Sequence, residues 1–318
     1  MGLKQKQYVI SGGAGFLGSH LTEKLLQEGS NVTVLDNLCT GVMENIKAFQ
    51  ANPNFRFIEH DITKPIDIDG PVDFVCNLAS PASPPNYFKI PLETLETNSI
   101  GTRNMLELAK EKQARFFHTS TSEVYGDPTV HPQPETYFGN VESYCKRSCY
   151  DEGKRYAEAL IYIYRHNYGV NTGIIRIFNT YGPRMLGFDG RVVSTFIRQA
   201  LANQSITIQG GGQQTRSFCY VDDQVEGMNK MIHSDEEGPI NIGNPGEFTI
   251  LELAQKVIDL THSRSKIIHI EAAPSDPKQR KPDIALAKQK LNWQPQVNLE
   301  QGLAKTITWF KQNSGAYA

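Results

Sequence analysis

The chain has 318 residues, long enough to bury a full core as one large α/β domain or as a domain with a smaller attachment. Its 32 lysines and arginines are balanced by 34 aspartates and glutamates, which excludes the basic excess that a nucleic-acid-binding protein needs. No apolar run approaches the ~20 residues of a membrane span, and the short polar N-terminus predicts neither a signal peptide nor a membrane anchor, so we expect no nucleic-acid or membrane partner.

The first 36 residues predict a dinucleotide-binding unit. An apolar strand runs into the sequence Gly-Gly-Ala-Gly-Phe-Leu-Gly, which opens a helix, and a second apolar strand then ends in Asp36. The glycines let the backbone approach a pyrophosphate at the helix N-terminus, where free N–H groups favour anions. Asp36 can accept hydrogen bonds from an adenosine ribose and would repel a 2′-phosphate, which favours NAD over NADP. The predicted cofactor-binding residues of this unit are Gly12, Gly15, Phe16, Leu17, Gly18, Asp36 and Asn37.

The α/β alternation continues with strands predicted at residues 55–59 and 72–78. A Pro-rich segment at residues 79–87 follows, and we expect it to be a loop that is neither helix nor central strand. In a doubly wound sheet, the loops at the carboxyl ends of the strands line the ligand crevice. The cofactor-binding residues predicted at these strand ends are Asp61, Ile62, Leu78, Ala79 and Ser80.

A helix predicted at about residues 92–112 leads into a strand at residues 115–120. Four hydroxyl residues and a carboxylate gather at the end of this strand, over residues 119–123, and would lie at the edge of the crevice. The alternative is a Ser/Thr-rich turn that caps the strand. His118 is expected to be an ordinary strand residue rather than a ligand.

The next predicted helix, at residues 148–167, carries Tyr150 and Lys154 four positions apart on one face. A phenol titrates near pH ~10, and a nearby ammonium group favours its phenolate. The pair is therefore a candidate proton acceptor for a hydroxyl that is being oxidised. The alternative is an amphipathic helix with a surface lysine and a half-buried tyrosine, because Tyr-x-x-x-Lys is common by chance. Tyr150 and the residues at 119–123 would face the same nicotinamide.

A sixth strand is predicted at residues 171–177, and beyond it the pattern changes to shorter strands at 206–208, 217–221 and 240–242. Helices are expected near residues 192–202, 224–233, 250–260, 283–291 and 299–313. We predict an α/β fold, a doubly wound parallel sheet of the Rossmann type with a smaller, discontinuous C-terminal substrate domain. The cofactor domain would comprise residues 1–180 with a return at 215–245, and the substrate domain residues 181–318, mainly 181–214 and 246–318.

The five cysteines are scattered and lack paired Cys-x-x-Cys spacing, which predicts reduced thiols in a cytoplasmic protein. Cys145 and Cys149 are four residues apart and could meet on a helix, but two lone thiols make a poor metal site. We therefore expect no bound metal.

Together these features resemble the extended short-chain dehydrogenases/reductases, whose Thr/Ser, Tyr and Lys match Thr121, Tyr150 and Lys154. Within that superfamily the chain closely resembles the UDP-glucuronate decarboxylases, also called UDP-xylose synthases. The combination of Ser-Pro-Ala-Ser-Pro-Pro-Asn-Tyr with Cys-Tyr-Asp-Glu-Gly-Lys-Arg is far more specific than the glycine motif. The matching stretches span nearly the whole chain, at residues 78–87, 120–128, 149–155, 177–184, 189–193, 214–216 and 280–283.

The resemblance implies an NAD-dependent lyase that converts UDP-glucuronate to UDP-xylose. Oxidation at C4 places a ketone β to the C6 carboxylate, CO2 is lost because the ketone accepts the electrons, and return of the hydride gives a pentose. By resemblance, Tyr150 takes the C4 hydroxyl proton, Lys154 binds the nicotinamide ribose and lowers the pKa of the tyrosine, and Thr121 hydrogen-bonds the sugar oxygen.

The same resemblance assigns the decarboxylation step to three residues. Ser122 and Glu123 match positions that handle the ring and the carboxylate during CO2 loss, and Arg280 matches an arginine that engages the carboxylate and the enolate. The sequence around Arg280 alone would indicate a solvated basic cluster in a polar loop. The residues that match substrate-binding positions are Tyr87, Asn179, Arg191, Gln209, Arg216 and Arg280. Members of the superfamily dimerise through a four-helix bundle, so we expect a homodimer built on the helices at 92–112 and 150–167.

The chain departs from the family pattern in three places. Residues 142–147 replace an Asn-Pro-Ile-Gly-Pro-Arg run before the catalytic tyrosine, and Gln209 stands where the family has a tyrosine beneath the base. Animal members carry an N-terminal membrane anchor, which we do not expect for this chain. The alternative functions are a nucleotide-sugar 4,6-dehydratase, a 4-epimerase, or a catalytically dead NAD-binding regulator. An intact Thr121, Tyr150 and Lys154 argues against the regulator, and Arg280 argues against the dehydratase.

Overall fold

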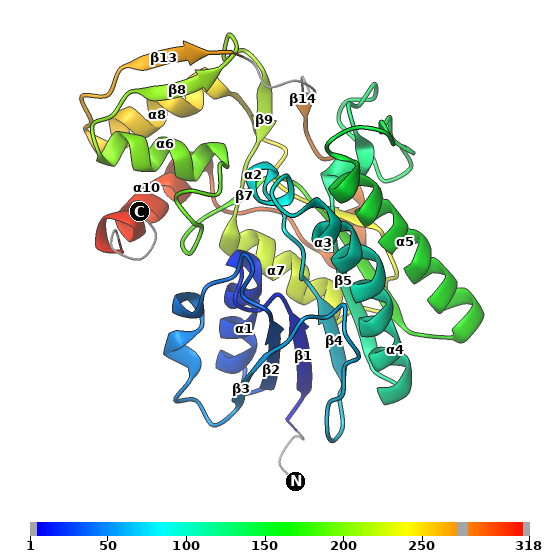
Figure 1. Ribbon diagram of the computed structural model, residues 1–318. Coiled ribbons are helices and arrows are strands. Elements are labelled where there is room, and N and C mark those ends of the chain that lie inside the picture. Colours follow the sequence, from blue (N-terminus) through cyan, green and yellow to red (C-terminus); the bar gives the residue numbers. More distant parts are fainter. Residues whose placement is uncertain (1–4, 272–278, 314–318) are drawn as a thin grey trace.

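The computed structural model describes residues 5–271 and 279–313, and its centre is a seven-stranded parallel sheet in the order β11-β6-β5-β4-β1-β2-β3 (Figure 1). This order confirms the predicted doubly wound sheet, because the chain moves outward from β1 in one direction and then returns to continue in the other. The strands are β1 (Gln7–Ser11), β2 (Asn31–Asp36), β3 (Phe55–Glu59), β4 (Phe74–Asn77), β5 (Arg115–Thr121), β6 (Thr172–Ile177) and β11 (Ile240–Ile242).

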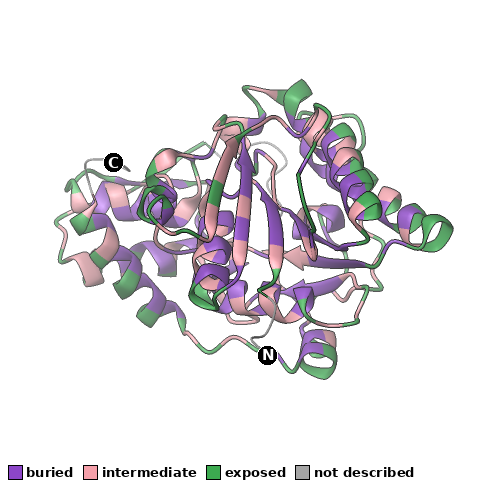
Figure 2. Ribbon diagram, turned by 90° about the horizontal axis from the view of Figure 1, so that it is seen from below, coloured by how far each residue is buried: buried purple, intermediate pink, exposed green. Residues whose placement is uncertain are grey.

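Helices cover both faces of this sheet because its strands present apolar side chains to both sides. Tyr8 and Ile10 of β1 point into the core cluster that contains the helices α1 (Phe16–Gln27) and α7 (Val221–Ile232). Val9 points into the opposite cluster, with the helices α4 (Thr102–Lys112) and α5 (Ser148–Tyr168). Figure 2 shows the strands buried in the middle and the outer sides of the helices exposed.

A smaller C-terminal lobe stands above the carboxyl ends of the sheet strands (Figure 1). Its strands form small sheets of two or three, in which β9 pairs antiparallel with β12 and parallel with β14. The elements are β7 (Thr180–Tyr181), α6 (Val192–Leu201), β8 (Ile206–Gln209), β9 (Thr215–Ser217), β10 (Cys219–Tyr220), β12 (Glu247–Thr249), α8 (Ile250–Thr261), β13 (Ile267–Ile270), β14 (Gln279–Arg280), α9 (Ala285–Leu291) and α10 (Leu299–Gln312). The division into two domains at the boundaries given above stays a prediction.

Two predicted elements differ from the structure. The Pro-rich segment contains a single helical turn, α2 (Pro84–Tyr87), because prolines at the first two helical positions remove only N–H groups that have no partner in the first turn. The strand expected at residues 217–221 divides into β9 and β10, and Val221 already begins α7.

The long helix expected at residues 92–112 is continuous in its course but consists of three parts. They are α3 (Pro91–Glu96), a π-helical turn η3 (Thr97–Gly101) and α4. Short 3₁₀ turns lie elsewhere, at η1 (Met43–Asn45), η2 (Lys47–Phe49) and η4 (Ser122–Tyr125).

The cysteines do not form a bonded or clustered set. All five are free, and Cys145 precedes the first residue of α5, so it does not share a helix with Cys149 as the spacing had suggested. Over residues 5–271 and 279–313, no helix is both long and apolar enough to cross a membrane.

Candidate active site

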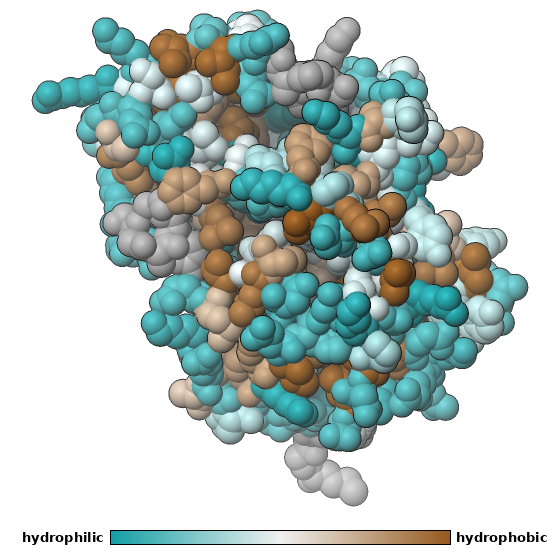
Figure 3. All heavy atoms as spheres, in the orientation of Figure 1, coloured by the Kyte–Doolittle hydropathy of each residue, from teal (hydrophilic) through white to brown (hydrophobic). Residues whose placement is uncertain are grey.

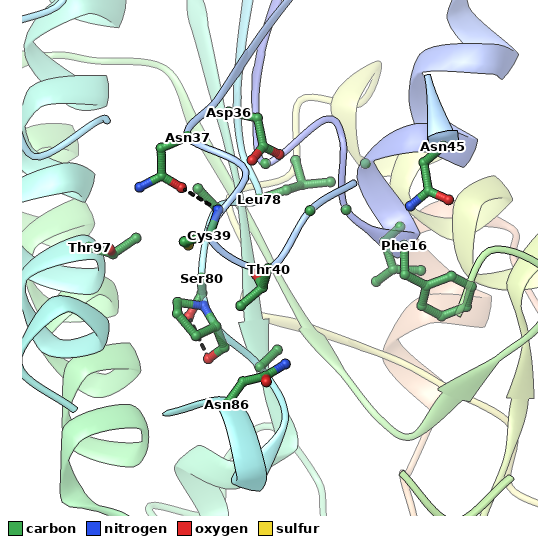
Figure 4. A pocket seen from close by; sticks show the side chains of 18 of the residues that line it. Phe16, Asp36, Asn37, Cys39, Thr40, Asn45, Leu78, Ser80, Asn86 and Thr97 are labelled. Carbon is green, nitrogen blue, oxygen red and sulfur yellow. Dashed lines mark hydrogen bonds between the residues drawn. The ribbon is translucent and has the colours of Figure 1, made fainter. Parts of the chain in front are cut away.

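Two neighbouring cavities lie at the carboxyl ends of the sheet strands, and they share several lining residues, among them Leu78, Ser80 and Arg191. The first, of about 160 Å³, is shown in Figure 4. The second is larger, at about 620 Å³, and lies between the sheet and the C-terminal lobe. This is the place at which a doubly wound fold binds its ligands.

The first cavity collects every residue that we predicted for the cofactor, apart from Tyr150 and Lys154. Figure 4 shows Asp36 at the end of β2 and Asn37 and Thr40 just after it, with Ser80 and Asn86 contributed by the segment after β4. The residues of the prediction that line it are Gly12, Gly15, Phe16, Leu17, Gly18, Asp36, Asn37, Asp61, Ile62, Leu78, Ala79 and Ser80. The sequence analysis missed Cys39, Thr40, Gly41 and Asn45, which carry no local pattern that marks them.

The glycine turn has the shape that a pyrophosphate requires. Gly12 has a φ of +73°, which side chains rarely adopt, and a Cβ on Gly18 would lie 2.1 Å from the carbonyl oxygen of Gly12. The Asp36 carboxylate accepts hydrogen bonds from the backbone N–H groups of Ala14 (2.9 Å) and Leu38 (2.8 Å). Burial raises the pKa of Asp36, and these two bonds oppose the rise. The turn and the acid fit the pyrophosphate and ribose of NAD.

The second cavity brings together all residues predicted for catalysis and substrate binding, from segments far apart in the sequence. They are Tyr87, Thr121, Ser122, Glu123, Tyr150, Lys154, Asn179, Arg191, Gln209, Arg216 and Arg280. Thr121 ends β5, Tyr150 and Lys154 lie on α5, and Arg280 arrives on β14 from the C-terminal lobe.

Tyr150 is buried in the wall of this cavity, and its ring stacks on Tyr87 with centroids 5.2 Å apart. Burial raises the pKa of Tyr150, while a hydrogen bond with Thr121 lowers it. Lys154 donates from Nζ to the Thr119 carbonyl at 2.9 Å, and burial lowers the pKa of Lys154 to about 7, against an opposing effect of Glu158. The lowering of the Tyr150 pKa by Lys154 stays a prediction; in this structure the Lys154 ammonium donates to the Thr119 carbonyl.

Glu123 lies between two arginines. One carboxylate oxygen accepts from Arg280 Nη1 and the other from Arg147 Nη2, while Arg280 Nη2 also donates to the Gly126 carbonyl at 3.0 Å. Burial alone would raise the pKa of Glu123, but the two guanidinium groups outweigh it and hold that pKa below its ordinary value. The carboxylate is thus ionised at neutral pH.

Arg280 is only 3 % exposed, so it does not belong to the solvated basic cluster that its local sequence indicates. Its strand pairs with β9, which places Arg280 opposite Arg216 in the register. A buried guanidinium needs paired partners, and Glu123 supplies the charge.

Arg147 was not predicted as a site residue. It lies three positions before Tyr150, where α5 begins, and so reaches the same face of the helix. That spacing was the available signal. Its Nε also donates to Asp151 Oδ2 at 3.3 Å, which makes a cluster of two arginines and two carboxylates.

The other two arginines predicted to bind the substrate, Arg191 and Arg216, also line this cavity. Arg191 donates from Nε to Asp189 at 2.6 Å, and its guanidinium lies 5.6 Å from the ring centre of Phe16. Arg216 donates to the Thr215 carbonyl at 2.8 Å, and Gln209 ends β8 at the cavity wall. In the described part of the chain, no group of three His, Cys, Asp or Glu side chains is placed to hold a metal ion.

Comparisons with known proteins agree with this geometry. The family model described as GDP-mannose 4,6 dehydratase matches residues 9–306. UDP-glucuronic acid decarboxylase 5 of Arabidopsis thaliana is 54% identical over 310 residues, which cover 97% of this chain and 90% of the relative. UDP-glucuronic acid decarboxylase 1 of Danio rerio is 52% identical over 308 residues, covering 97% and 73% respectively.

A solved structure has the same fold and carries ligands. The UDP-glucuronic acid 4-epimerase of Bacillus cereus, in complex with UDP-glucuronic acid and NAD, superposes with a TM-score of 0.87 at 29% identity. The match covers 96% of this chain and 99% of the epimerase. The dTDP-glucose 4,6-dehydratase DesIV of Streptomyces venezuelae, with NAD and TYD bound, superposes with a TM-score of 0.89 at 26% identity, covering 98% of each chain.

Gly18→Ala should weaken NAD binding, because the new Cβ would push against the backbone of Gly12 and Gly13 and open the turn. Overpacking of this kind costs ~1–3 kcal/mol, which corresponds to a loss of roughly 10- to 100-fold in affinity. Gly211→Ala is the matched control, since nothing lies within 4 Å of a Cβ there. Titration calorimetry with NAD compares the two, and equal affinities would contradict the assigned role of the turn.

Proposed function

The chain belongs to the GDP-mannose 4,6 dehydratase family, within the extended short-chain dehydrogenase/reductase superfamily, and from that premise we propose that it is a UDP-glucuronate decarboxylase. It converts UDP-glucuronate to UDP-xylose with NAD as its cofactor. The observation that carries the proposal is that one cavity combines Tyr150 with Glu123 held between two arginines. Oxidation of a sugar hydroxyl needs a proton acceptor, which is Tyr150. Binding of a sugar carboxylate needs a charged site, which is Glu123 with its two arginines.

In the redox step, some residues of the chain bind the cofactor and others transfer the proton. The glycine turn and Asp36 of the first cavity would hold NAD, which would supply the hydride acceptor and donor for C4 of the sugar. Tyr150 accepts the proton of the C4 hydroxyl, and Thr121 keeps the phenol in place through their hydrogen bond. Stacking on Tyr87 fixes the plane of the Tyr150 ring.

Carbon dioxide loss depends on the charged side of the cavity. With a ketone at C4, the C5–C6 bond breaks and its electron pair moves to the C4 oxygen. Arg280 binds the departing carboxylate and stabilises the enolate, because its guanidinium is buried and keeps its charge. Ser122 contributes a hydroxyl beside Glu123 at the ring. Arg191, Arg216, Asn179 and Gln209 bind the nucleotide part, with Arg216 directed to the diphosphate.

We also propose that the protein is a homodimer. Figure 3 shows hydrophobic side chains among hydrophilic ones on the side of the molecule that carries α3 and α5. The large apolar side chains exposed on α3, η3 and α5 are Leu92, Leu95, Ile100, Tyr156, Tyr162, Ile163 and Tyr168. Exposed large apolar side chains gathered on neighbouring helices favour an interaction site there. The five free cysteines support a cytoplasmic location.

Incubation of the purified protein with UDP-glucuronate and NAD should release CO2 and yield UDP-xylose or its 4-keto precursor. Gas release and separation of the nucleotide sugars measure both products. Formation of a 4-keto-6-deoxy sugar from another nucleotide hexose, without CO2 from UDP-glucuronate, would identify a dehydratase and refute the proposal.

Tyr150→Phe should reduce turnover by ~10²–10⁴-fold, because phenylalanine keeps the ring packing on Tyr87 and loses the proton acceptor. NAD affinity should stay close to that of the parent protein. Tyr162→Phe, on an exposed position of the same helix, is the control and should leave turnover unchanged. Near-normal turnover of the Tyr150→Phe protein contradicts the role given to Tyr150.

Leu92→Glu combined with Tyr156→Glu should convert the dimer to a monomer, because both side chains are at least half exposed on the proposed dimer face and each change would bury a charge there. Light scattering measures the mass. Ile268→Glu, on β13 in the C-terminal lobe, is the control and should leave the dimer intact. A dimer that survives the double substitution places the contact elsewhere.

A further inference from the structure

Asp151 is a buried carboxylate next to the proposed catalytic tyrosine, and the mechanism above gives it no task. It is 5 % exposed, on the first turn of α5. Its Oδ2 accepts from Arg147 Nε at 3.3 Å, whereas its Oδ1 is buried and finds no hydrogen-bond partner among the described residues. A buried oxygen without a donor is costly when it carries charge and much less so when the group is neutral.

The surroundings of Asp151 come from four parts of the fold. Glu123 faces it from η4 and Arg280 from β14, while Arg147 lies at the start of its own helix. The other titratable side chains whose charge interacts with Asp151 are Tyr87 of α2 and Cys149 and Tyr150 of α5. Burial raises the pKa of Asp151 to about 7, Glu123 adds to the rise, and the two arginines oppose it.

Of these four groups, Glu123 and the two arginines keep their charge, and Asp151 can change its charge. Glu123 is bound to both arginines and stays ionised, and the arginines do not lose their protons. With both carboxylates ionised, two positive charges meet two negative ones, so the cluster is neutral. A substrate carboxylate that binds beside Arg280 would give the cluster a net charge of −1. Protonation of Asp151 would make the cluster neutral again.

The proposed reaction itself consumes one proton per turnover. The C5–C6 bond breaks, the carboxylate carbon leaves as neutral CO2, and the electron pair forms an enolate with the C4 ketone. The enolate then takes a proton at C5 to give the 4-keto pentose. The negative charge that entered with the substrate is thus cancelled by a proton before the product leaves.

We propose that Asp151 takes up a proton from solvent when the C6 carboxylate of UDP-glucuronate binds beside Arg280 and Arg147, and releases it to solvent once CO2 has left and the enolate has been protonated at C5. This inference rests on the proposed decarboxylase function. Asp151 does not line the substrate cavity and acts through Arg147, so it is a positioning residue: when it is neutral, the charge of Arg147 is shared only by Glu123 and the substrate.

Calorimetry on the Tyr150→Phe protein loaded with NAD tests the proposal, because that protein binds substrate without turning it over. Titrations with UDP-glucuronate at pH 7 in two buffers of different ionisation enthalpy give the number of protons taken up. We expect uptake of up to one proton per bound ligand, because burial raises the pKa of Asp151 and ligand binding favours its protonated form. UDP-glucose, which lacks the carboxylate, should bind with no uptake. Equal uptake for both ligands, or none for either, overturns the proposal.

Two further substitutions in the Tyr150→Phe protein test whether the proton is taken up by Asp151 or by Lys154, whose pKa burial lowers to about 7. Asp151→Asn keeps an acceptor oxygen for Arg147 and should abolish the uptake while UDP-glucuronate still binds. Lys154→Met removes the amine whose pKa burial lowers to about 7 and should leave the uptake in place. Uptake that persists after Asp151→Asn, or disappears after Lys154→Met, overturns the assignment. Either variant decides the question if the other does not fold.

Turnover of the parent protein separates this inference from the function on which it rests. Where CO2 is released but binding takes up no proton, the decarboxylase proposal stands and the role of Asp151 fails. Where no CO2 is released, both fail. As a second readout, the KM for UDP-glucuronate should rise by up to tenfold per pH unit above pH 7 in the parent, because binding favours protonated Asp151. In the Asp151→Asn enzyme this dependence should disappear, with kcat affected less than KM.

Discussion

The ion pair between Glu123 and Arg280 joins residues 157 positions apart, and the substrate cavity depends on it. A buried arginine without a charged partner would be strongly unfavourable, so Glu123 stabilises β14 in its docked position together with the backbone contacts to β9 and Gln133. The docking in turn completes the small sheet with β9 and aligns Arg280 with Arg216. This pair of charges adds to the shared apolar core that joins the lobe to the sheet, and it forms part of the wall of the substrate cavity.

On the redox side of the cavity, burial rather than ion pairing controls the charges of Tyr150 and Lys154. Burial disfavours the charged forms of both Tyr150 and Lys154, so the tyrosine keeps its proton more firmly and the lysine loses its proton more easily than in water. Thr121 opposes this effect at the phenol, and Glu158 opposes it at the amine. Burial thus favours the neutral form of both groups, and Thr121 and Glu158 reduce this effect. The carboxylate side, by contrast, keeps fixed charges by pairing them.

Local patterns were sufficient for the central sheet and the cofactor turn, because each sheet strand is an apolar run that ends in turn residues. They were insufficient for β7, β12, β13 and β14, which are two to four residues long and exist only through tertiary pairing. The burial of Arg280 could not be read from its polar neighbours, because its contacts with β9, Glu123 and Gly126 are all distant in sequence. Arg147 was overlooked because the segment before α5 was considered only as a departure from a family pattern, although its spacing from Tyr150 placed it on the catalytic face.

The same fold serves epimerases and dehydratases, so the sheet, the glycine turn and the Tyr150–Lys154 pair do not by themselves select a reaction. What selects it is the charge that meets the 4-keto sugar near C5 and C6. In this chain that charge is a balanced set of two arginines and two carboxylates, of which one carboxylate is fixed by both arginines and the other is not. A neutral cluster attracts an anion only weakly unless one of its groups can take up a proton when the anion binds. Asp151, whose buried Oδ1 has no hydrogen-bond partner among the described residues, is therefore the group that we expect to change its charge when the substrate carboxylate binds and again when it leaves as CO2.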